Sequence, residues 1–211
     1  MSMRDPLRRR FACFLLALVA GALAPTRTGA QTVEEVVRLK TRGEVEQAYW
    51  LVRPATPVRV VAVLFTGGYG LLKLRATDSG VVWDREGSSY LVLNKDLFVD
   101  GETAVALIDV PSDQWNFGYI PRFRKSAAHA VDVAAVVGDL RRRFAQARIF
   151  LVGTSQGTTS AAYAGKALGQ DIDGVVLTAS VLEWAPASWR YLNDSNLKDF
   201  DFSTLAAPLL I

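Results

Sequence analysis

Three residues of this 211-residue chain have types and a spacing that suit nucleophilic chemistry: Gly153, Ser155 and Gly157. An apolar run, residues 149–152, precedes them, and residues 158–164 suit a helix. A strand–turn–helix of this kind exposes a serine hydroxyl at the end of a strand, where it can attack a carbonyl carbon. The glycines fit a sharp turn in which backbone and helix approach closely. We predict that Ser155 is a nucleophile; the alternative is an ordinary turn in which Ser155 only caps the helix.

A flexible glycine loop occurs earlier in the chain. Residues 58–65 are apolar except for Arg59, which is typical of a strand buried on both faces of a parallel sheet. Residues 66–70 follow, with the flexible sequence TGGYG. Backbone amides at the start of the helix after Ser155 are expected to face a developing oxyanion, and preorganised donors of this kind stabilise acyl-transfer transition states.

Strand-like and helix-like stretches alternate along the rest of the chain. An antiparallel hairpin is predicted at the edge of the sheet, with strands at 36–40 and 44–52; a short helix is the alternative for residues 31–40. Residues 71–86 are polar and form an excursion. Further strands are predicted at 103–110, 149–152 and 174–178, and helices at 88–99, 126–144 and from the Ser155 turn to about 168. This alternation predicts an α/β fold, a mostly parallel sheet flanked by helices.

The first 30 residues have the pattern of an export signal peptide. Residues 8–10 are arginines, and residues 11–24 form an apolar run too short for a comfortable membrane span. Small residues at 28–30 suit cleavage, which leaves residues 31–211 as one domain; residues 22–24 are a rival site. We predict a periplasmic or secreted protein with no membrane span after cleavage, exported by a general or a twin-arginine signal. An uncleaved anchor helix is the alternative.

The net charge of +3 comes from this N-terminal segment. Residues 1–30 hold five of the 24 Lys and Arg residues but one of the 21 acidic residues, so residues 31–211 carry 19 bases and 20 acids. A nearly neutral domain is not a basic nucleic-acid binder. The only cysteine, Cys13, lies in the apolar run, so the cleaved domain has no disulfide, no thiolate nucleophile and no cysteine-ligated zinc.

Strand, glycine loop, strand, helix, Ser155 turn and strand, in this order, resemble the α/β-hydrolase superfamily over residues 35–211. The resemblance implies a serine hydrolase with Ser155 as nucleophile and an oxyanion hole formed by the backbone amides of Gln156 and Gly68. Thr66 stands where the family usually has histidine. The resemblance also implies a small-molecule substrate, by default a carboxylic ester with a peptide as the runner-up, and no metal or organic cofactor.

The family's other two catalytic residues, an acid and then a histidine, follow the nucleophile in sequence. The only histidine, His129, precedes Ser155, and we expect it on a helix surface or at the edge of the core. Four acidic residues after Ser155 are expected to be solvated carboxylates rather than the triad acid: Asp173, Asp194, Asp199 and Asp201. Residues 206–211 begin another buried strand, so we expect a chain truncated before the acid and histidine. The alternative is a short edge strand that closes the fold.

Two functions of different classes are therefore open, a serine hydrolase and a non-catalytic protein, either a dead fragment or a small-ligand binder. A nucleotide-binding α/β domain is excluded, because residues 153–157 are too short for a phosphate loop and lack its lysine. Near the Ser155 edge, residues 109–113 either line a pocket or only turn the chain. Four aromatic residues form either an apolar pocket or ordinary core: Trp115, Tyr119, Trp184 and Trp189.

Overall fold

The computed structural model describes residues 32–84, 89–182 and 196–211. The predicted signal peptide lies outside the described residues, as do Trp184, Trp189 and Asp194. Within the three described ranges, no helix is both long enough and apolar enough to cross a bilayer.

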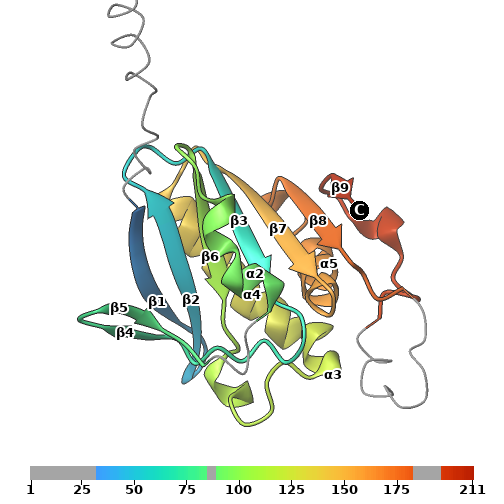
Figure 1. The fold of residues 1–211 in the computed structure, drawn as a ribbon. Coiled ribbons are helices and arrows are strands. Elements are labelled where there is room, and N and C mark those ends of the chain that lie inside the picture. The colour runs from blue at the N-terminus through green and yellow to red at the C-terminus, as the bar shows by residue number, and fades with distance from the viewer. Residues whose placement is uncertain (1–31, 85–88, 183–195) are drawn as a thin grey trace, which may run out of the picture. The chain divides into compact units, whose positions relative to one another are not determined.

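A mostly parallel sheet forms the centre of the described chain (Figure 1). Its seven described strands lie in the order β1-β2-β6-β3-β7-β8-β9. β1 pairs antiparallel with β2, and β2 with β6, while all other neighbours are parallel. The arrangement confirms the predicted α/β class and the antiparallel hairpin. The bounds are β1 Thr32–Arg42, β2 Val45–Pro54, β3 Val60–Phe65, β6 Thr103–Ile108, β7 Arg148–Thr154, β8 Gly174–Thr178 and β9 Leu209–Leu210.

The hairpin shows why the segment before Gly43 is not helical. β1 pairs with β2 along its whole length, from Thr32 opposite Pro54 to Arg42 opposite Val45. Gly43 takes a φ of 57° in the connecting turn, a conformation that glycine adopts without strain. The helical alternative is wrong, because strand pairing outweighs the local helix preference.

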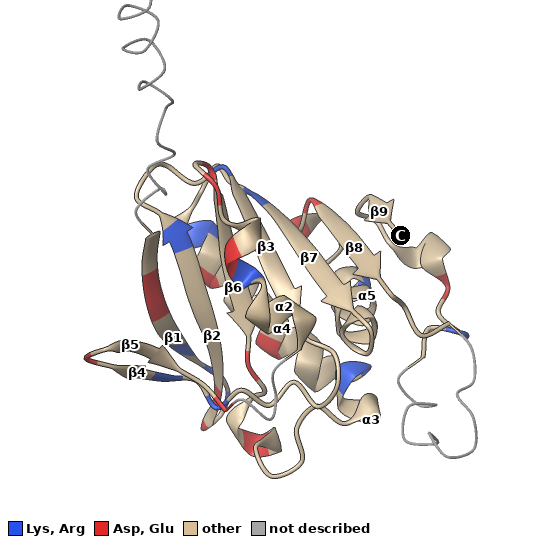
Figure 2. Cartoon of the chain, in the orientation of Figure 1, with Lys and Arg blue, Asp and Glu red and all other residues tan. Residues whose placement is uncertain are grey.

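Helices and loops cover both faces of the sheet. Successive residues of a strand point to opposite faces. The odd-numbered residues of β3 pack in one core cluster with α4 (Ala127–Arg143) and α5 (Gly157–Leu168), and its even-numbered residues pack in a second cluster with α2 (Tyr90–Leu93). As Figure 2 shows, β3, β6 and β8 carry no charged residue. Burial on both faces explains these apolar runs.

The single helix predicted over residues 88–99 is instead two short pieces, α2 and the 3₁₀ helix η3 (Lys95–Phe98). Asn94 lies between them at φ −114° and ψ 15°, and its side-chain amide donates to the Tyr90 carbonyl at 2.8 Å. Asparagine competes in this way with helical backbone bonds. The predicted polar excursion contains a small hairpin of β4 (Arg75–Thr77) and β5 (Gly80–Val82).

The remaining described helices are single turns that connect larger elements. They are α3 Pro121–Arg124 and the 3₁₀ helices η4 Ser112–Gln114, η5 Gly169–Asp171 and η7 Phe202–Thr204. β9 pairs parallel with β8, which places a strand where residues 206–211 predicted one. α4 confirms the helix predicted over residues 126–144, before the Ser155 turn, and α5 confirms the helix predicted after it.

Candidate active site

Ser155 lies in the turn between β7 and α5 and is partly exposed. Its φ is 52°, a value that residues other than glycine rarely adopt. Its amide donates to the Thr178 carbonyl at 3.1 Å, and its carbonyl accepts from the Thr158 amide at 3.1 Å and the Thr158 hydroxyl at 2.6 Å. Strained backbone held by such bonds is typical of functional sites.

Gly153 and Gly157 leave no room for a side chain. A Cβ on Gly157 would lie 2.1 Å from the Phe65 carbonyl oxygen, and one on Gly153 would lie 2.5 Å from the Gly157 carbonyl oxygen. Both obstacles are backbone atoms, which cannot rotate away. α5 therefore begins in direct contact with the end of β3, and the two glycines make that approach possible.

The glycine loop, residues 66–70, lies beside Ser155. Phe65 of β3 and Gly153 of β7 are paired across the sheet, so the two parallel strands end at the same edge. A Cβ on Gly67 would lie only 3.1 Å from the Cβ of Ser155. The structure thus brings the Gly-x-Ser-x-Gly turn and the glycine loop, far apart in sequence, into contact.

The two predicted oxyanion positions flank this contact. Gln156 is buried and is the N-cap residue of α5, where backbone amides have no partner within the helix. Gly68 is exposed and follows Gly67 in the loop. Among the described residues, neither amide donates a hydrogen bond to another described group. Both positions can therefore offer an N–H group to a substrate oxygen.

Several solved hydrolase structures share this arrangement of strands. A cold-adapted esterase from an Arctic intertidal metagenomic library matches with a TM-score of 0.50 and 18% identity, over 72% of this chain and 62% of its own. Brefeldin A esterase, a bacterial homologue of human hormone sensitive lipase, matches with a TM-score of 0.50 and 17% identity, over 91% and 54% of the two chains. A post-proline cleaving enzyme from Rickettsia typhi matches with a TM-score of 0.50 and 17% identity, over 72% and 21%. The chain has the α/β-hydrolase fold.

The α/β-hydrolase fold was the one that the Ser155 motif and the strand order predicted, and it is confirmed. The chain spans 62%, 54% and 21% of the lengths of these three structures. No protein-family model and no curated protein sequence matches it.

Arg124 is the residue of this candidate site that sequence reasoning missed. Its side chain is fully buried, and its Nη2 donates to the carbonyls of Thr66 at 3.1 Å and Gly68 at 2.8 Å. Its Nη1 donates to the Ser160 hydroxyl of α5 at 2.8 Å. Burial lowers the pKa of Arg124 to about 10, with a smaller opposing effect from Tyr119. Its neighbours Arg122 and Lys125 are not buried, and in sequence the cluster reads as a solvated surface.

Asp109 holds the segment that follows the glycine loop, residues 72–74. Its carboxylate accepts hydrogen bonds from the amides of Leu72, Lys73, Leu74 and Val110, at 2.7 to 3.2 Å. Burial raises the pKa of Asp109, and these amide bonds oppose that rise. The carboxylate is fully buried. Of the two interpretations of residues 109–113, pocket lining is therefore wrong for Asp109, which organises the chain instead.

Of the four aromatic residues predicted to form a pocket or core, the two that the structure describes belong to the protein's own packing. Tyr119 is buried and its hydroxyl donates to the Asp109 carbonyl at 2.7 Å. The indole N–H of Trp115 donates to the Val110 carbonyl at 3.0 Å, and its ring packs against the main core. For both residues the core interpretation holds.

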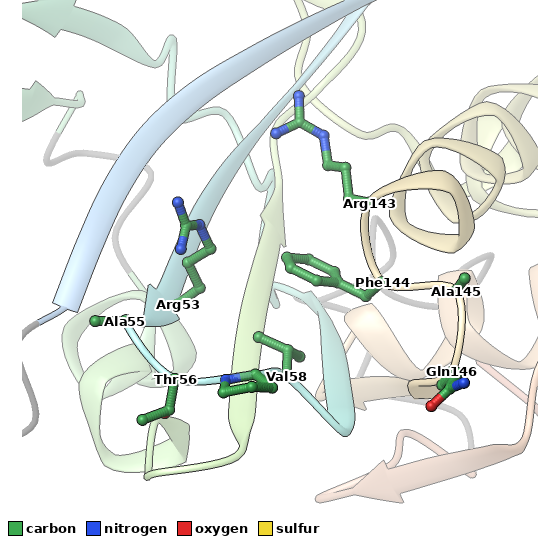
Figure 3. Close-up of a pocket in the computed structure, with 9 residues that line it drawn as sticks. Arg53, Ala55, Thr56, Val58, Arg143, Phe144, Ala145 and Gln146 are labelled. Carbon is green, nitrogen blue, oxygen red and sulfur yellow. The ribbon is translucent and has the colours of Figure 1, made fainter.

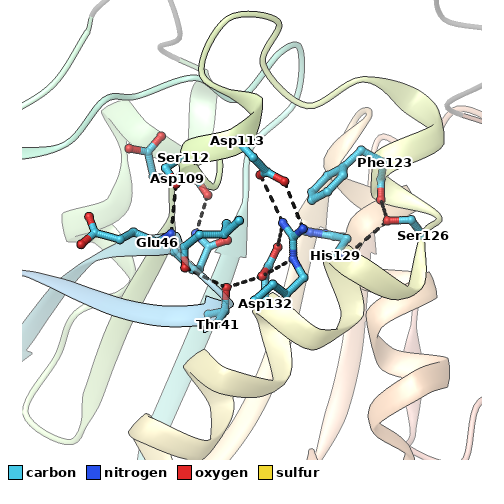
Figure 4. A network of polar contacts seen from close by, with 12 residues as sticks. Thr41, Glu46, Asp109, Ser112, Asp113, Phe123, Ser126, His129 and Asp132 are labelled. Carbon is cyan, nitrogen blue, oxygen red and sulfur yellow. Dashed lines mark hydrogen bonds and ion pairs between the residues drawn. The ribbon is translucent and has the colours of Figure 1, made fainter.

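His129 is fully buried in the core, so the expected helix-surface or core-edge position is wrong. Its ring lies among Phe65, Tyr119 and Phe123, with ring-centre distances of 6.1, 5.1 and 5.4 Å. Figure 4 shows its place on α4, where its backbone amide donates to Ser126. Neither ring nitrogen has a hydrogen-bond partner among the described residues. Burial, with smaller effects from Arg124 and Arg42, lowers the pKa of His129 to about 3, so its ring is neutral. Because neither ring nitrogen is hydrogen-bonded within the described chain, His129 is not bonded to Ser155.

Three of the four acids named in the sequence analysis are described, and two of them, Asp173 and Asp201, have structural contacts. Asp173 precedes β8, pairs with Arg141 at 2.8 Å and accepts from the Ile149 amide at 2.8 Å, so it lies at the sheet edge opposite Ser155. Asp201 is exposed and caps η7 by accepting from Ser203. Asp199 is exposed. None of these three accepts a hydrogen bond from a histidine.

A cavity of about 400 Å³ lies at that opposite edge (Figure 3). Its walls come from the segment before β3 and the segment between α4 and β7: Arg53, Ala55, Thr56, Pro57, Val58, Arg143, Phe144, Ala145 and Gln146. Because these residues precede β3 and β7 whereas Ser155 follows β7, this cavity is not the binding site of the candidate nucleophile. Within the described ranges, no cluster of three or more His, Cys, Asp or Glu residues is arranged to hold a metal ion.

Proposed function

We propose that the chain is a serine hydrolase that cleaves carboxylic esters through an acyl-enzyme on Ser155. One observation carries the proposal: Ser155 takes a φ of 52° in a turn whose glycines admit no Cβ, directly against the glycine loop. An ordinary helix cap needs neither the strain nor the loop. The exposed turn places the hydroxyl where a carbonyl carbon can approach it.

In this mechanism the Ser155 hydroxyl oxygen attacks the ester carbonyl and a general base takes its proton. The amides of Gln156 and Gly68 donate to the oxyanion of the tetrahedral intermediate, and the amino end of α5 adds a favourable dipole. The intermediate expels the alcohol, which takes up a proton, and leaves an acyl group on Ser155. Water then attacks the acyl carbon and releases the carboxylic acid.

The described chain has no histidine placed to act as the general base. His129 is the only histidine of the 211 residues, and it is buried and unprotonated in the core. We therefore propose that the base and its acidic partner come from residues outside this sequence. The same burial favours the second candidate function, a non-catalytic α/β-hydrolase-like protein that binds a small ligand.

The substrate and location are part of the proposal. Esterases stand among the matched structures, and a post-proline cleaving enzyme supports a serine peptidase as the alternative within the class. We propose that the substrate is a small-molecule ester and that residues 1–30 direct export. Residues 31–211 then form the domain that carries Ser155.

A fluorophosphonate probe tests the nucleophile. An activated serine oxygen displaces fluoride from phosphorus and becomes covalently labelled, so wild-type protein that includes the proposed base should be labelled, and the same protein with Ser155→Ala should not. Ser203→Ala is the control, because Ser203 is exposed and only bonds Asp201. Equal labelling of wild type and Ser155→Ala contradicts the nucleophile, and labelling lost in Ser203→Ala contradicts its assignment to Ser155.

A further inference from the structure

We propose that Arg124 is a positioning residue that holds the glycine loop in the conformation in which it faces Ser155. The inference rests on the proposed function, because it assigns the loop an oxyanion-binding role. It goes further in naming a residue of α3 that lies outside both the Ser155 motif and the loop.

Arg124 contacts both the glycine loop and α5, the two elements that meet at Ser155. Its Nη2 binds two carbonyls of the glycine loop, those of Thr66 and Gly68, and its Nη1 binds Ser160 in the first turns of α5. One rigid guanidinium thus links the loop to the helix that begins beside Ser155. A planar fork of donors fixes direction as well as distance, which a lysine ammonium does not.

The carbonyl contacts determine where the loop's amides point. In a trans peptide the C=O and N–H groups point in opposite directions. With the Thr66 and Gly68 carbonyls turned toward Arg124, the N–H groups of those two peptides point away from it. The peptide that carries the Gly68 amide lies between these two anchored peptides, so Arg124 restrains the loop on both sides of that amide.

The charge of Arg124 is unusually placed. Within the described residues it forms no ion pair, although it is fully buried, and its nearby ring is Tyr119, 4.5 Å from the guanidinium carbon to the ring centre. A buried cation needs compensation, and here two peptide carbonyls, one hydroxyl and a ring face supply it. The buried guanidinium therefore stabilises the loop conformation in which these two carbonyls point toward it.

The space around Gly70 confirms that the loop and Arg124 fit closely. A Cβ on Gly70 would lie 2.8 Å from the Thr66 hydroxyl oxygen, 2.8 Å from a Tyr119 ring carbon and 3.4 Å from Arg124 Nη2. Tyr119 also donates its amide to the Tyr69 carbonyl at 2.7 Å. The loop is packed onto the Arg124 side chain rather than merely near it.

The test compares Arg124→Met with a matched control, Arg141→Met. Arg141 also donates to two backbone carbonyls, those of Ala147 at 2.7 Å and Asp171 at 2.9 Å, but at the opposite sheet edge. In folded protein we expect Arg124→Met to lower the rate of Ser155 labelling by about 10- to 100-fold, less than the roughly 100- to 1,000-fold cost of removing an oxyanion donor outright. Hydrolysis of a p-nitrophenyl ester should lose kcat with little change in KM. Arg141→Met should alter neither.

Three further measurements keep the outcome decisive. Arg124→Lys should restore labelling in part, and Ser160→Ala, which removes one contact, should lower it by a few fold, even if Arg124→Met does not fold. Hydrogen exchange of residues 66–70 should speed up in Arg124→Met or Arg124→Lys and not in Arg141→Met. Unchanged exchange in the loop, or unchanged labelling of a folded Arg124 variant, overturns the inference. If wild type is labelled no better than Ser155→Ala, the proposed function fails, while the exchange result still decides whether Arg124 anchors the loop.

Discussion

The two ends of the central sheet hold their charged side chains in different ways. At the amino end, Arg141 pairs with Asp173 and Arg143 with Glu35, in contacts whose side chains are between 34% and 40% exposed. At the carboxyl end, Arg124 and Asp109 are fully buried and bind backbone groups of residues 66–74, Arg124 in the glycine loop and Asp109 in the segment after it. Exposed pairs add little to stability, whereas buried charges that bond the backbone dictate its shape.

The difference separates what keeps the sheet together from what shapes the candidate site. The Arg141–Asp173 and Arg143–Glu35 pairs are partly exposed, so solvent can replace a lost partner. Among the described residues, the hydrogen-bond partners of Arg124 and Asp109 are buried or partly buried peptide groups, with the Ser160 hydroxyl as the one exception. A lost charge there leaves buried donors or acceptors unpaired, which is the expensive case.

The largest effect is expected at the contact between α5 and β3. Gly157→Ala should destabilise the protein by about 3–5 kcal/mol or prevent folding, since its Cβ meets backbone at 2.1 Å. Gly101→Ala is the control, because nothing lies within 4 Å of a Cβ there. Urea unfolding measures both. Equal stability of the two variants would show that α5 can move away from β3 freely.

A matched pair of carboxylate variants tests the two ends directly. Asp109→Asn should lower the free energy of unfolding by about 2–4 kcal/mol, because one oxygen becomes a donor facing buried amides. Asp173→Asn should lower it by about 1 kcal/mol or less, as for an exposed ion pair. The comparison between the ends fails if Asp173→Asn proves as damaging as Asp109→Asn.

His129 gives the smallest effect at neutral pH and a larger one in acid. Its pKa of about 3 in the fold lies below the ordinary 6.5, so the unfolded chain binds a proton first. The stability of the neutral form is present above pH 6.5 and is lost as the pH falls toward 3. Between pH 7 and pH 5 the wild type should lose about 2 kcal/mol more than His129→Leu. Parallel stability curves for the two proteins over this range would contradict a buried neutral His129.

The sequence predicted the sheet and the Ser155 turn because their signals are local. Apolar runs identify β3 and β7, and the motif Gly153-x-Ser155-x-Gly157 prescribes its own turn. Arg124 and Asp109 could not be found in this way. Their partners lie 35 to 58 residues away in sequence, apart from the Asp109 bond to Val110.

The position of His129 was predicted wrongly for a related reason. The pattern of α4 placed it on a helix, but only the packing of Phe65, Tyr119 and Phe123 against that helix makes the position a core site. Asn94 shows that a local contact can also defeat the prediction. The apolar spacing predicts a helix through residue 99, but the side-chain bond from Asn94 to the Tyr90 carbonyl ends it earlier. The roles of Ser155, Gln156 and Gly68, like the export signal, stay predictions.

The bonds of Arg124 also set an order of events during folding. The guanidinium joins the end of β3, α3 and α5, which stand far apart along the chain. Such loops close late, because their entropy must be overcome before their contacts form. The Ser155 amide likewise needs the Thr178 carbonyl of β8 in place before its hydrogen bond can form. We therefore expect the strained turn and its glycine loop to be among the last parts of the sheet to take shape during folding.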